Sequence, residues 1–355
     1  MKIFRGFDVL LFVPMILLIS FGIIVLFSTS APVARDQLVF TLLGLILYFF
    51  ASFTDFKILR PFSFYIYVLN IIFLIITLGF GIYSKGAIRW IPLGIEGFTL
   101  QPSEFMKISL IIFLSSFLSY RFRSASLKDF LLSFFTVLLP AILIFIQPDL
   151  GTAFIVILIW LLLSLIARLK LSSFVILFLI ILVISPVLFL SLKPYQKERI
   201  QTFLSPSLDP LGAGYHVLQS EIAVGSGGIF GRGFGRGTQS HLRFLPEFHT
   251  DFIFASLSEE WGFLGSFIVI ILFGLILVRS TVIALRSQSL FGQLLCLGVM
   301  VMIFSQVTIN IGMNLGVAPI TGIPLPLLSS GGSSLVLTMV SLGLVQSVAR
   351  TLKRV

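Results

Sequence analysis

The chain has 355 residues, of which 57% are hydrophobic and only 11% are charged. A soluble domain is about 45–50% apolar and about 25% charged, so this composition excludes a soluble enzyme, while the lack of low-complexity tracts excludes a disordered or fibrous chain. The formal charge of +10, from 24 Lys and Arg against 14 Asp and Glu, is typical either of a nucleic-acid binder or of a membrane protein with basic cytoplasmic loops.

Uncharged apolar intervals predict ten membrane-spanning helices, since one crossing needs about 20 mostly apolar residues. The first interval is too long for a signal peptide and has no small-residue cleavage site, which favours a retained helix. The interval 287–349 carries no charge, and its centre, 310–332, is rich in Gly, Pro and Asn, so we expect two spans and a loop there. The other spans are expected at 9–34, 37–54, 61–84, 102–120, 130–148, 150–167, 171–192 and 261–278.

The fourth predicted span contains an acid and a base. Its uncharged part, 108–120, would be about 20 Å long, too short for a hydrocarbon core of about 30 Å, so the helix must begin near Pro102. Glu104 and Lys107 then lie on one helical face within the outer part of the span. Ionisable side chains in a membrane usually mark a cavity or a functional site. The alternative is a structural ion pair with a lysine that reaches towards the headgroups.

The loop charges predict the orientation. An even number of spans puts both termini on one side, where the segments carry 14 basic and three acidic residues, against 10 and 11 on the other side. The positive-inside rule therefore makes both termini cytoplasmic. Topology accounts for the whole charge excess, and nucleic-acid binding is not expected because the cytoplasmic bases are scattered over short segments.

Three outer loops are unusually polar: 82–103, the tight turn 147–152, and a long loop, 193–260, between the seventh and eighth spans. Long loops are usually functional or disordered, and the aromatic residues of the third argue against disorder. We therefore expect one membrane domain, 1–355, whose loop 193–260 forms short helices and carries the active site.

The loop 193–260 contains a Gly-rich segment, 225–240. Glycines let successive backbone amides form an anion nest, and Arg232, Arg236 and Arg243 would suit a phosphate. The alternative is a flexible surface loop, since neither the Rossmann nor the P-loop glycine pattern is present. The single cysteine, Cys296, provides neither an internal disulfide nor a metal site.

Asp251 opens a short apolar stretch that ends at Glu259 and Glu260. A short helix or helical extension is expected there, at the outer membrane surface. Asp251 could cap this helix, or it could act as a general base at the membrane boundary, with His249 and Glu247 as rival bases.

Several strings spread over nearly the whole chain resemble the SEDS family (shape, elongation, division and sporulation proteins), ten-span membrane glycosyltransferases that polymerise peptidoglycan. They include RW at 89–90, QPSE at 101–104, QPDLGT at 147–152, GTQS at 237–240 and HTDFIF at 249–254. The turn 147–152 and the string GIPLP at 322–326 are more similar to the rod-shape branch than to the division branch. Two positions depart from the family pattern, Ser330 in place of Tyr and Phe248 in place of a small or basic residue.

The resemblance implies an all-α integral protein of the bacterial cytoplasmic (inner) membrane that polymerises lipid II into glycan strands during cell elongation. Asp251 is then the catalytic carboxylate, which deprotonates the acceptor hydroxyl in an inverting transfer while cations stabilise the diphosphate leaving group. The expected substrate-binding residues are Glu104, Lys107, Arg89, Arg199, Arg232, Arg236, Arg243, Gln239 and His249.

The expected partners are lipid II and lipid-linked glycan, membrane lipids, and a class B penicillin-binding protein. The residues themselves require no cofactor and predict no metal site, although a divalent cation is left open. Two alternatives stay open at this point. Intramembrane charges and broken helices also suit a lipid II flippase or transporter, and the chain could be a non-catalytic scaffold.

Overall fold

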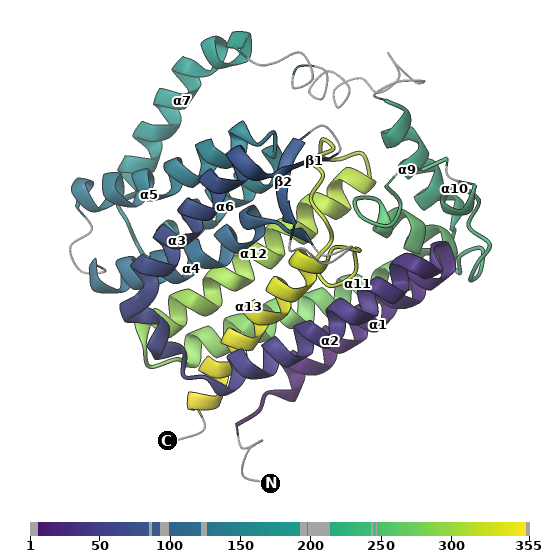
Figure 1. The fold of residues 1–355 in the computed structure, drawn as a ribbon, viewed down its shortest axis with the longest axis horizontal. Helices are drawn as coiled ribbons and strands as arrows, with labels where there is room; N and C mark the ends of the chain where they lie inside the picture. The colour runs from purple at the N-terminus through teal and green to yellow at the C-terminus, as the bar shows by residue number, and fades with distance from the viewer. Residues whose placement is uncertain are drawn as a thin grey trace.

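The computed structural model describes residues 6–84, 87–92, 99–121, 126–191, 197, 214–242, 244–245 and 247–352. Most of these residues are helical (Figure 1). Eight helices within them are long and apolar enough to cross a membrane, and each overlaps an interval predicted as a span, although Ala31–Phe53 begins before the predicted 37 and Ile253–Arg286 extends beyond 261–278 at both ends. They are α1 (Val9–Thr29), α2 (Ala31–Phe53), α3 (Leu59–Phe80), α4 (Pro102–Arg121), α5 (Leu127–Ile146), α11 (Ile253–Arg286), α12 (Leu290–Asn314) and α13 (Gly332–Leu352).

Four further α-helices lie within the described residues. Two are apolar, α6 (Leu150–Ile166) and α7 (Leu171–Ser191). Two are short helices of the predicted outer loop, α9 (Tyr215–Ser226) and α10 (Thr238–His241). A single 3-10 turn, η1 (Phe56–Ile58), precedes α3. The prediction of a mostly helical membrane protein is therefore confirmed.

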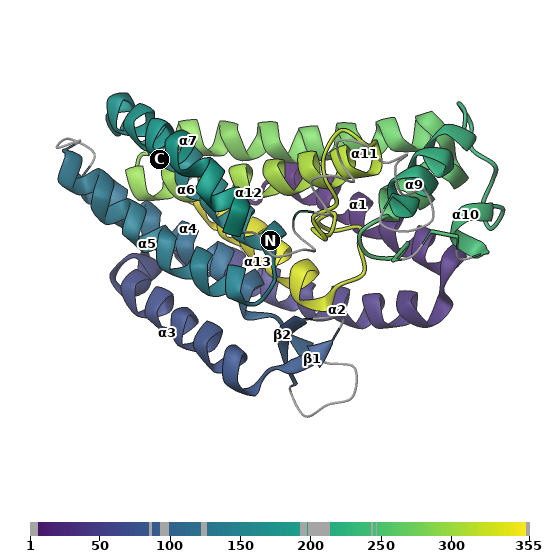
Figure 2. The same ribbon diagram turned by 90° about the horizontal axis from the view of Figure 1, so that it is seen from above.

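The all-α prediction needs one correction. The loop 82–103 contains three short strands, β1 (Ile82–Ser84), β2 (Ala87–Pro92) and β3 (Thr99–Leu100), which pair antiparallel in the order β1-β2-β3. The segment 88–91 consists of isoleucine and tryptophan around one arginine, residue types that favour strands when they are not enclosed in a bilayer. This small sheet lies beside the end of α3 (Figure 2), and it also contacts α4 and α13.

The helices form a core and a shell. In the apolar stretches of α4, α12 and α13, 72%, 72% and 78% of the residues are buried. In α2 and in the span that contains α3, only 33% are buried. The shell helices expose large apolar side chains such as Phe50 (71%) and Phe80 (82%). A membrane accommodates such a surface, which would be unfavourable in water. The central place of α4 explains how a charged pair on that helix can be buried.

Helix α11 is broken at Gly262, whose φ and ψ are 66° and −161°. The Gly-rich segment inserts its backbone into this break and replaces the missing helical hydrogen bonds. The four bonds are Phe263 N to Gly228 O (2.8 Å), Leu264 N to Ile229 O (3.1 Å), Arg232 N to Glu259 O (2.9 Å) and Gly233 N to Glu260 O (3.0 Å). A Cβ on Gly231 would lie 2.1 Å from Glu260 O, so the approach requires a glycine there.

Candidate active site

A cavity of about 470 Å³ lies between β2, the start of α4, the turn before α6, the turn before α11 and the loop that leads into α13. Its charged lining residues are Arg89, Glu104, Asp149, Glu247 and Asp251. The structure thus brings Arg89, Glu104 and Asp251, three residues predicted from separate motifs, to the same cavity. The carboxylates outnumber the cations in this lining. What the cavity can bind therefore depends on which of these charged side chains already have a partner within the protein.

Asp251 is held by its backbone in a tight turn. Its amide donates to Glu247 O (3.1 Å), and α11 begins two residues later at Ile253. The N-cap residue of α11 is Phe252, and no side chain caps the helix. Asp251 therefore lies one residue before the N-cap position of α11, and it lines the cavity.

Two buried asparagines of α12 fix the carbonyl of Asp251. Asn310 Nδ2 and Asn314 Nδ2 donate to Asp251 O at 3.0 and 3.1 Å. Asn314 Oδ1 also accepts from Ala255 N (3.1 Å), in the first turn of α11. Neither residue was among those predicted for the site, because the Asn, Gly and Pro content of 310–332 had predicted a loop there, whereas both asparagines lie in α12. Two amides four residues apart in an apolar span were the available signal.

The loop between α12 and α13 passes close to the Asp251 carboxylate at Gly322. This residue has a φ of +72°, and a Cβ on it would lie 3.6 Å from Asp251 Oδ2. A left-handed backbone favours glycine, and the absence of a side chain leaves the space beside the carboxylate open. The same loop is the one predicted at 310–332, although α12 continues to Asn314 and α13 already begins at Gly332.

Glu104 and Lys107 form a buried ion pair. Lys107 Nζ lies 2.7 Å from both carboxylate oxygens of Glu104, and each side chain is only 4% exposed. Glu104 lines the cavity, whereas Lys107 lies one helical turn further along α4 and is not part of the lining. The pair therefore presents a neutralised carboxylate to the cavity, with its counterion behind it.

Arg89 and Asp149 connect the sheet to the helices. Arg89 on β2 donates through Nε to Gln147 O (3.1 Å), also bonds Pro148 O, and has Nη1 3.9 Å from Asp149 Oδ1. Asp149 caps α6 by accepting from Thr152 N (3.2 Å) and accepts from Gln101 Nε2 (3.2 Å). The Arg89 side chain remains 21% exposed, so it is anchored at the cavity wall and still accessible to a ligand.

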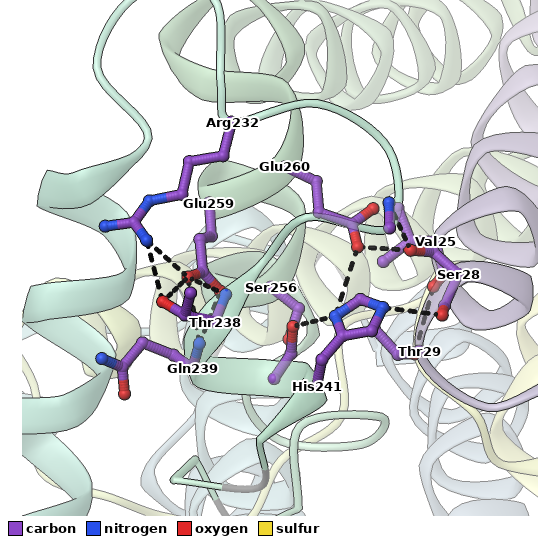
Figure 3. A network of polar contacts seen from close by, with 12 residues as sticks. Val25, Ser28, Thr29, Arg232, Thr238, Gln239, His241, Ser256, Glu259 and Glu260 are labelled. Carbon is purple, nitrogen blue, oxygen red and sulfur yellow. Dashed lines mark hydrogen bonds and ion pairs between the residues drawn. The ribbon is translucent and has the colours of Figure 1, made fainter.

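The Gly-rich segment surrounds a different pair of carboxylates (Figure 3). Glu259 is fully buried and accepts from Thr238 N (2.7 Å) and Gln239 N (3.0 Å). Arg232 Nη1 donates to Thr238 Oγ1 (2.8 Å) and lies 4.0 Å from Glu259 Oε1. Hence Arg232 and the Gln239 backbone neutralise and solvate a carboxylate of the protein itself.

Glu260, the neighbour of Glu259, faces α1. It accepts from the hydroxyl of Ser28, and His241 Nδ1 lies 3.9 Å from its Oε1. His241 Nε2 lies 2.9 Å from Ser28 O, so the Gly-rich segment is attached to α1 as well as to α11 (Figure 3).

Several predicted site residues are not brought to the cavity. Arg232, Arg236, Gln239 and His249 do not line it. The carbonyl of His249 accepts from Ser330 N (2.9 Å) and Ser330 Oγ (2.8 Å), which ties the Asp251 turn to the start of α13. Two others, Arg199 and Arg243, lie outside the described residues.

A bundle of lipid-exposed helices with a buried ion pair and a carboxylate-lined cavity defines a multispan membrane protein with a site for a polar group. A family model described as "Cell cycle protein", which covers FtsW, RodA and SpoVE, matches residues 2–354. The chain belongs to this family, which confirms the resemblance found in the sequence.

The named relatives agree with this assignment. The peptidoglycan glycosyltransferase MrdB of Escherichia coli K12 is 42% identical over 285 residues, 80% of this chain and 76% of that protein. The peptidoglycan glycosyltransferase RodA of Treponema pallidum is 35% identical and covers 96% of this chain and 97% of its own length. The chain is accordingly a peptidoglycan glycosyltransferase.

Solved structures share its fold. A chain from a peptidoglycan synthase complex that coordinates polymerization and crosslinking superposes with a TM-score of 0.85 at 31% identity, covering 98% of this chain and 99% of that one. The rod shape determining protein RodA of Thermus thermophilus gives 0.74 at 29% identity, with 97% of both chains covered.

Proposed function

We propose that the cavity around Asp251 is the site at which this glycosyltransferase joins lipid II units into a glycan strand during cell elongation. The observation that carries the proposal is the carboxylate of Asp251, which lines a cavity of about 470 Å³ together with an anchored arginine and a neutralised glutamate. Two buried asparagines fix its backbone, which is the preorganisation that a catalytic group needs.

Asp251 acts as a general base in this proposal. It takes the proton of the 4-hydroxyl of the acceptor N-acetylglucosamine as that oxygen bonds to C1 of a lipid-linked N-acetylmuramic acid. The bond from C1 to the lipid diphosphate breaks at the same time, the diphosphate leaves with the electron pair, and the configuration at C1 inverts. A diphosphate departs without a general acid, so one carboxylate suffices where a glycosidase uses two.

The remaining charges of the cavity have supporting roles. Arg89, anchored by backbone carbonyls yet still accessible, would orient an anionic or hydroxyl group of the substrate. Glu104, neutralised by Lys107, would accept a substrate hydroxyl without repelling the diphosphate strongly. Any divalent cation would share one or two of these carboxylates with the substrate diphosphate, because the described residues contain no cluster of three or more metal-binding side chains.

The topology proposed from the sequence is compatible with this site. Adding α6 and α7 to the eight long helices gives ten spans. Asp8, at the start of α1, and Leu352, at the end of α13, line one cavity together with Lys57, Arg279 and Arg286. A shared basic end supports cytoplasmic termini in the inner membrane and an Asp251 cavity that faces outwards, beside the loop 193–260.

A class B penicillin-binding protein is the proposed partner. Support comes from the structural relative with a TM-score of 0.85, which is a component of a peptidoglycan synthase complex. Such a partner would crosslink the strands that this chain polymerises.

Lipid II polymerisation by the purified chain, with and without the partner, tests the function. Glycan strands of many disaccharides are the expected product. Lipid II that crosses the bilayer of reconstituted vesicles with no polymer formed would refute the proposal in favour of a flippase or transporter.

A further inference from the structure

The loop that leads into α13 brings the string SSGGSS, 329–334, to the Asp251 cavity. Its first two serines are bonded to the Asp251 turn. Ser329 Oγ donates to Thr250 O (2.6 Å), and Ser330 N donates to His249 O (2.9 Å). The start of α13 is therefore held in a fixed position relative to the proposed base.

The N-terminal amides of α13 face no acceptor from the protein. The first bond of the helix runs from Leu335 N to Gly331 O (2.9 Å), so the amides of Gly332, Ser333 and Ser334 precede it. No described residue accepts a hydrogen bond from these three amides. The helix is 21 residues long, and its dipole adds a partial positive charge at this end.

Ser334 points independently to a ligand. The residue is only 8% exposed and lines the cavity, yet its hydroxyl has no hydrogen-bond partner within the described part of the chain. The neighbouring Ser333 hydroxyl, by contrast, donates to Thr99 O (3.1 Å). Because the residue borders the cavity and its hydroxyl is unbonded, that hydroxyl can donate to a group that enters the cavity, beside the open amides.

The two glycines of the string differ in whether packing requires them. A Cβ on Gly332 would lie 2.4 Å from the Phe40 ring, so packing alone explains this glycine. A Cβ on Gly331 would meet nothing closer than Ser334 Cβ, at 3.9 Å. Packing therefore does not require a glycine at 331, although a side chain there would project beside the open amides.

The charge distribution selects the ligand. The charged lining residues away from α13 are mostly carboxylates, which repel an anion, whereas the start of α13 offers unbonded backbone amides and the Ser334 hydroxyl as donors. We propose that this N-terminus, 332–334, binds the diphosphate of the lipid-linked donor substrate through its backbone amides and the Ser334 hydroxyl. This inference rests on the proposed function and names the group that the leaving diphosphate contacts. The serine bonds to the Asp251 turn then fix the leaving group relative to the base.

An isosteric pair of variants tests the proposal. Ser334→Asp and Ser334→Asn have nearly the same volume and differ in charge. Ser334 lies in the first turn of α13, where an aspartate favours the helix dipole, so a purely structural role predicts that the Asp variant is at least as stable and active as the Asn variant. A diphosphate site predicts the reverse for binding, because the carboxylate repels the ligand from the amides.

Binding is measured with the full chain in phosphatidylcholine nanodiscs and radiolabelled undecaprenyl diphosphate. We expect the Kd of Ser334→Asp to rise about tenfold or more over that of Ser334→Asn, with unchanged melting temperatures. Gly331→Ala should also weaken binding at unchanged stability. Inorganic pyrophosphate should compete and undecaprenol should not. Equal affinities for the Asp and Asn variants, or equal competition by phosphatidylglycerol, would overturn the assignment.

The same proteins separate this inference from the proposed function. If the wild-type chain polymerises lipid II but the Asp and Asn variants share one KM for it, the subsite is wrong and the function stands. If the wild-type chain binds undecaprenyl diphosphate with the expected variant pattern but forms no polymer, the proposed function fails and the diphosphate site stands.

Discussion

The Glu104–Lys107 pair should respond asymmetrically to the loss of its two members. Both side chains are 4% exposed and are joined by contacts of 2.7 Å. Glu104→Gln leaves an ammonium group inside α4, away from the cavity, whereas Lys107→Met leaves a carboxylate that lines the cavity and can be hydrated there. We therefore expect the glutamate substitution to be the more destabilising of the two.

The magnitude follows from the burial. Removing one partner of a buried ion pair typically costs about 3–5 kcal/mol of unfolding free energy, because the remaining charge stays in a low dielectric. Glu104→Gln should lie in this range, and Lys107→Met should lie below it. The double variant removes both charges and should lose less than the sum of the single losses, with a coupling of about 1–3 kcal/mol.

Reversible unfolding in detergent measures these stabilities, and lipid II polymerisation by the same four proteins measures activity. A double variant that is stable but inactive would make the pair functional, and one that is stable and active would make it structural. Equal losses for the two single variants, or additive losses in the double variant, would refute the reasoning from burial.

The remaining predictions concern the backbone supports and the cavity arginine. Asn314→Leu removes the donor to Asp251 O and the acceptor of Ala255 N, so the free energy of unfolding, measured by denaturation, should fall by about 1–3 kcal/mol. In steady-state kinetics, kcat should fall while lipid II binding is retained. Gly231→Ala should destabilise the chain by at least about 1–3 kcal/mol, because φ is +79° and the Cβ would collide with Glu260 O. Gly235→Ala is the matched control, since φ is +73° but the space around a Cβ is open, and it should lower the melting temperature less. Arg89→Lys keeps the charge but loses the forked contacts to the 147–149 turn, so KM for lipid II should rise several-fold, and an unchanged KM would count against a role for the guanidinium.

Sequence patterns were sufficient where the relevant contacts are local. Apolar intervals predicted the positions of the long helices, and the three-residue spacing of Glu104 and Lys107 predicted that they share a helical face, where they form an ion pair. In each case helical geometry alone sets the neighbours.

Contacts between distant segments could not be predicted in this way. The Gly-rich segment has the composition of an anion nest, but two of its amides bond carbonyls exposed by the break at Gly262, and its arginine meets a buried glutamate. Ser28 and Glu260 are 232 residues apart in the chain, and no periodicity links them. The asparagines and the SSGGSS string are uncharged, and only their hydrogen bonds to the turn around Asp251 reveal their importance.

The central claim is that Asp251 is the general base, and the most direct measurement is lipid II polymerisation by purified Asp251→Asn in complex with its partner, together with its affinity for lipid II. The amide is isosteric with the carboxylate and leaves the bonds to the Asp251 backbone in place. Loss of a general base typically lowers the rate about 10²–10⁴-fold, so polymerisation should fall by that factor while lipid II affinity and partner binding stay within about threefold of wild type. A folded, partner-bound Asp251→Asn that polymerises lipid II at the wild-type rate would contradict the account.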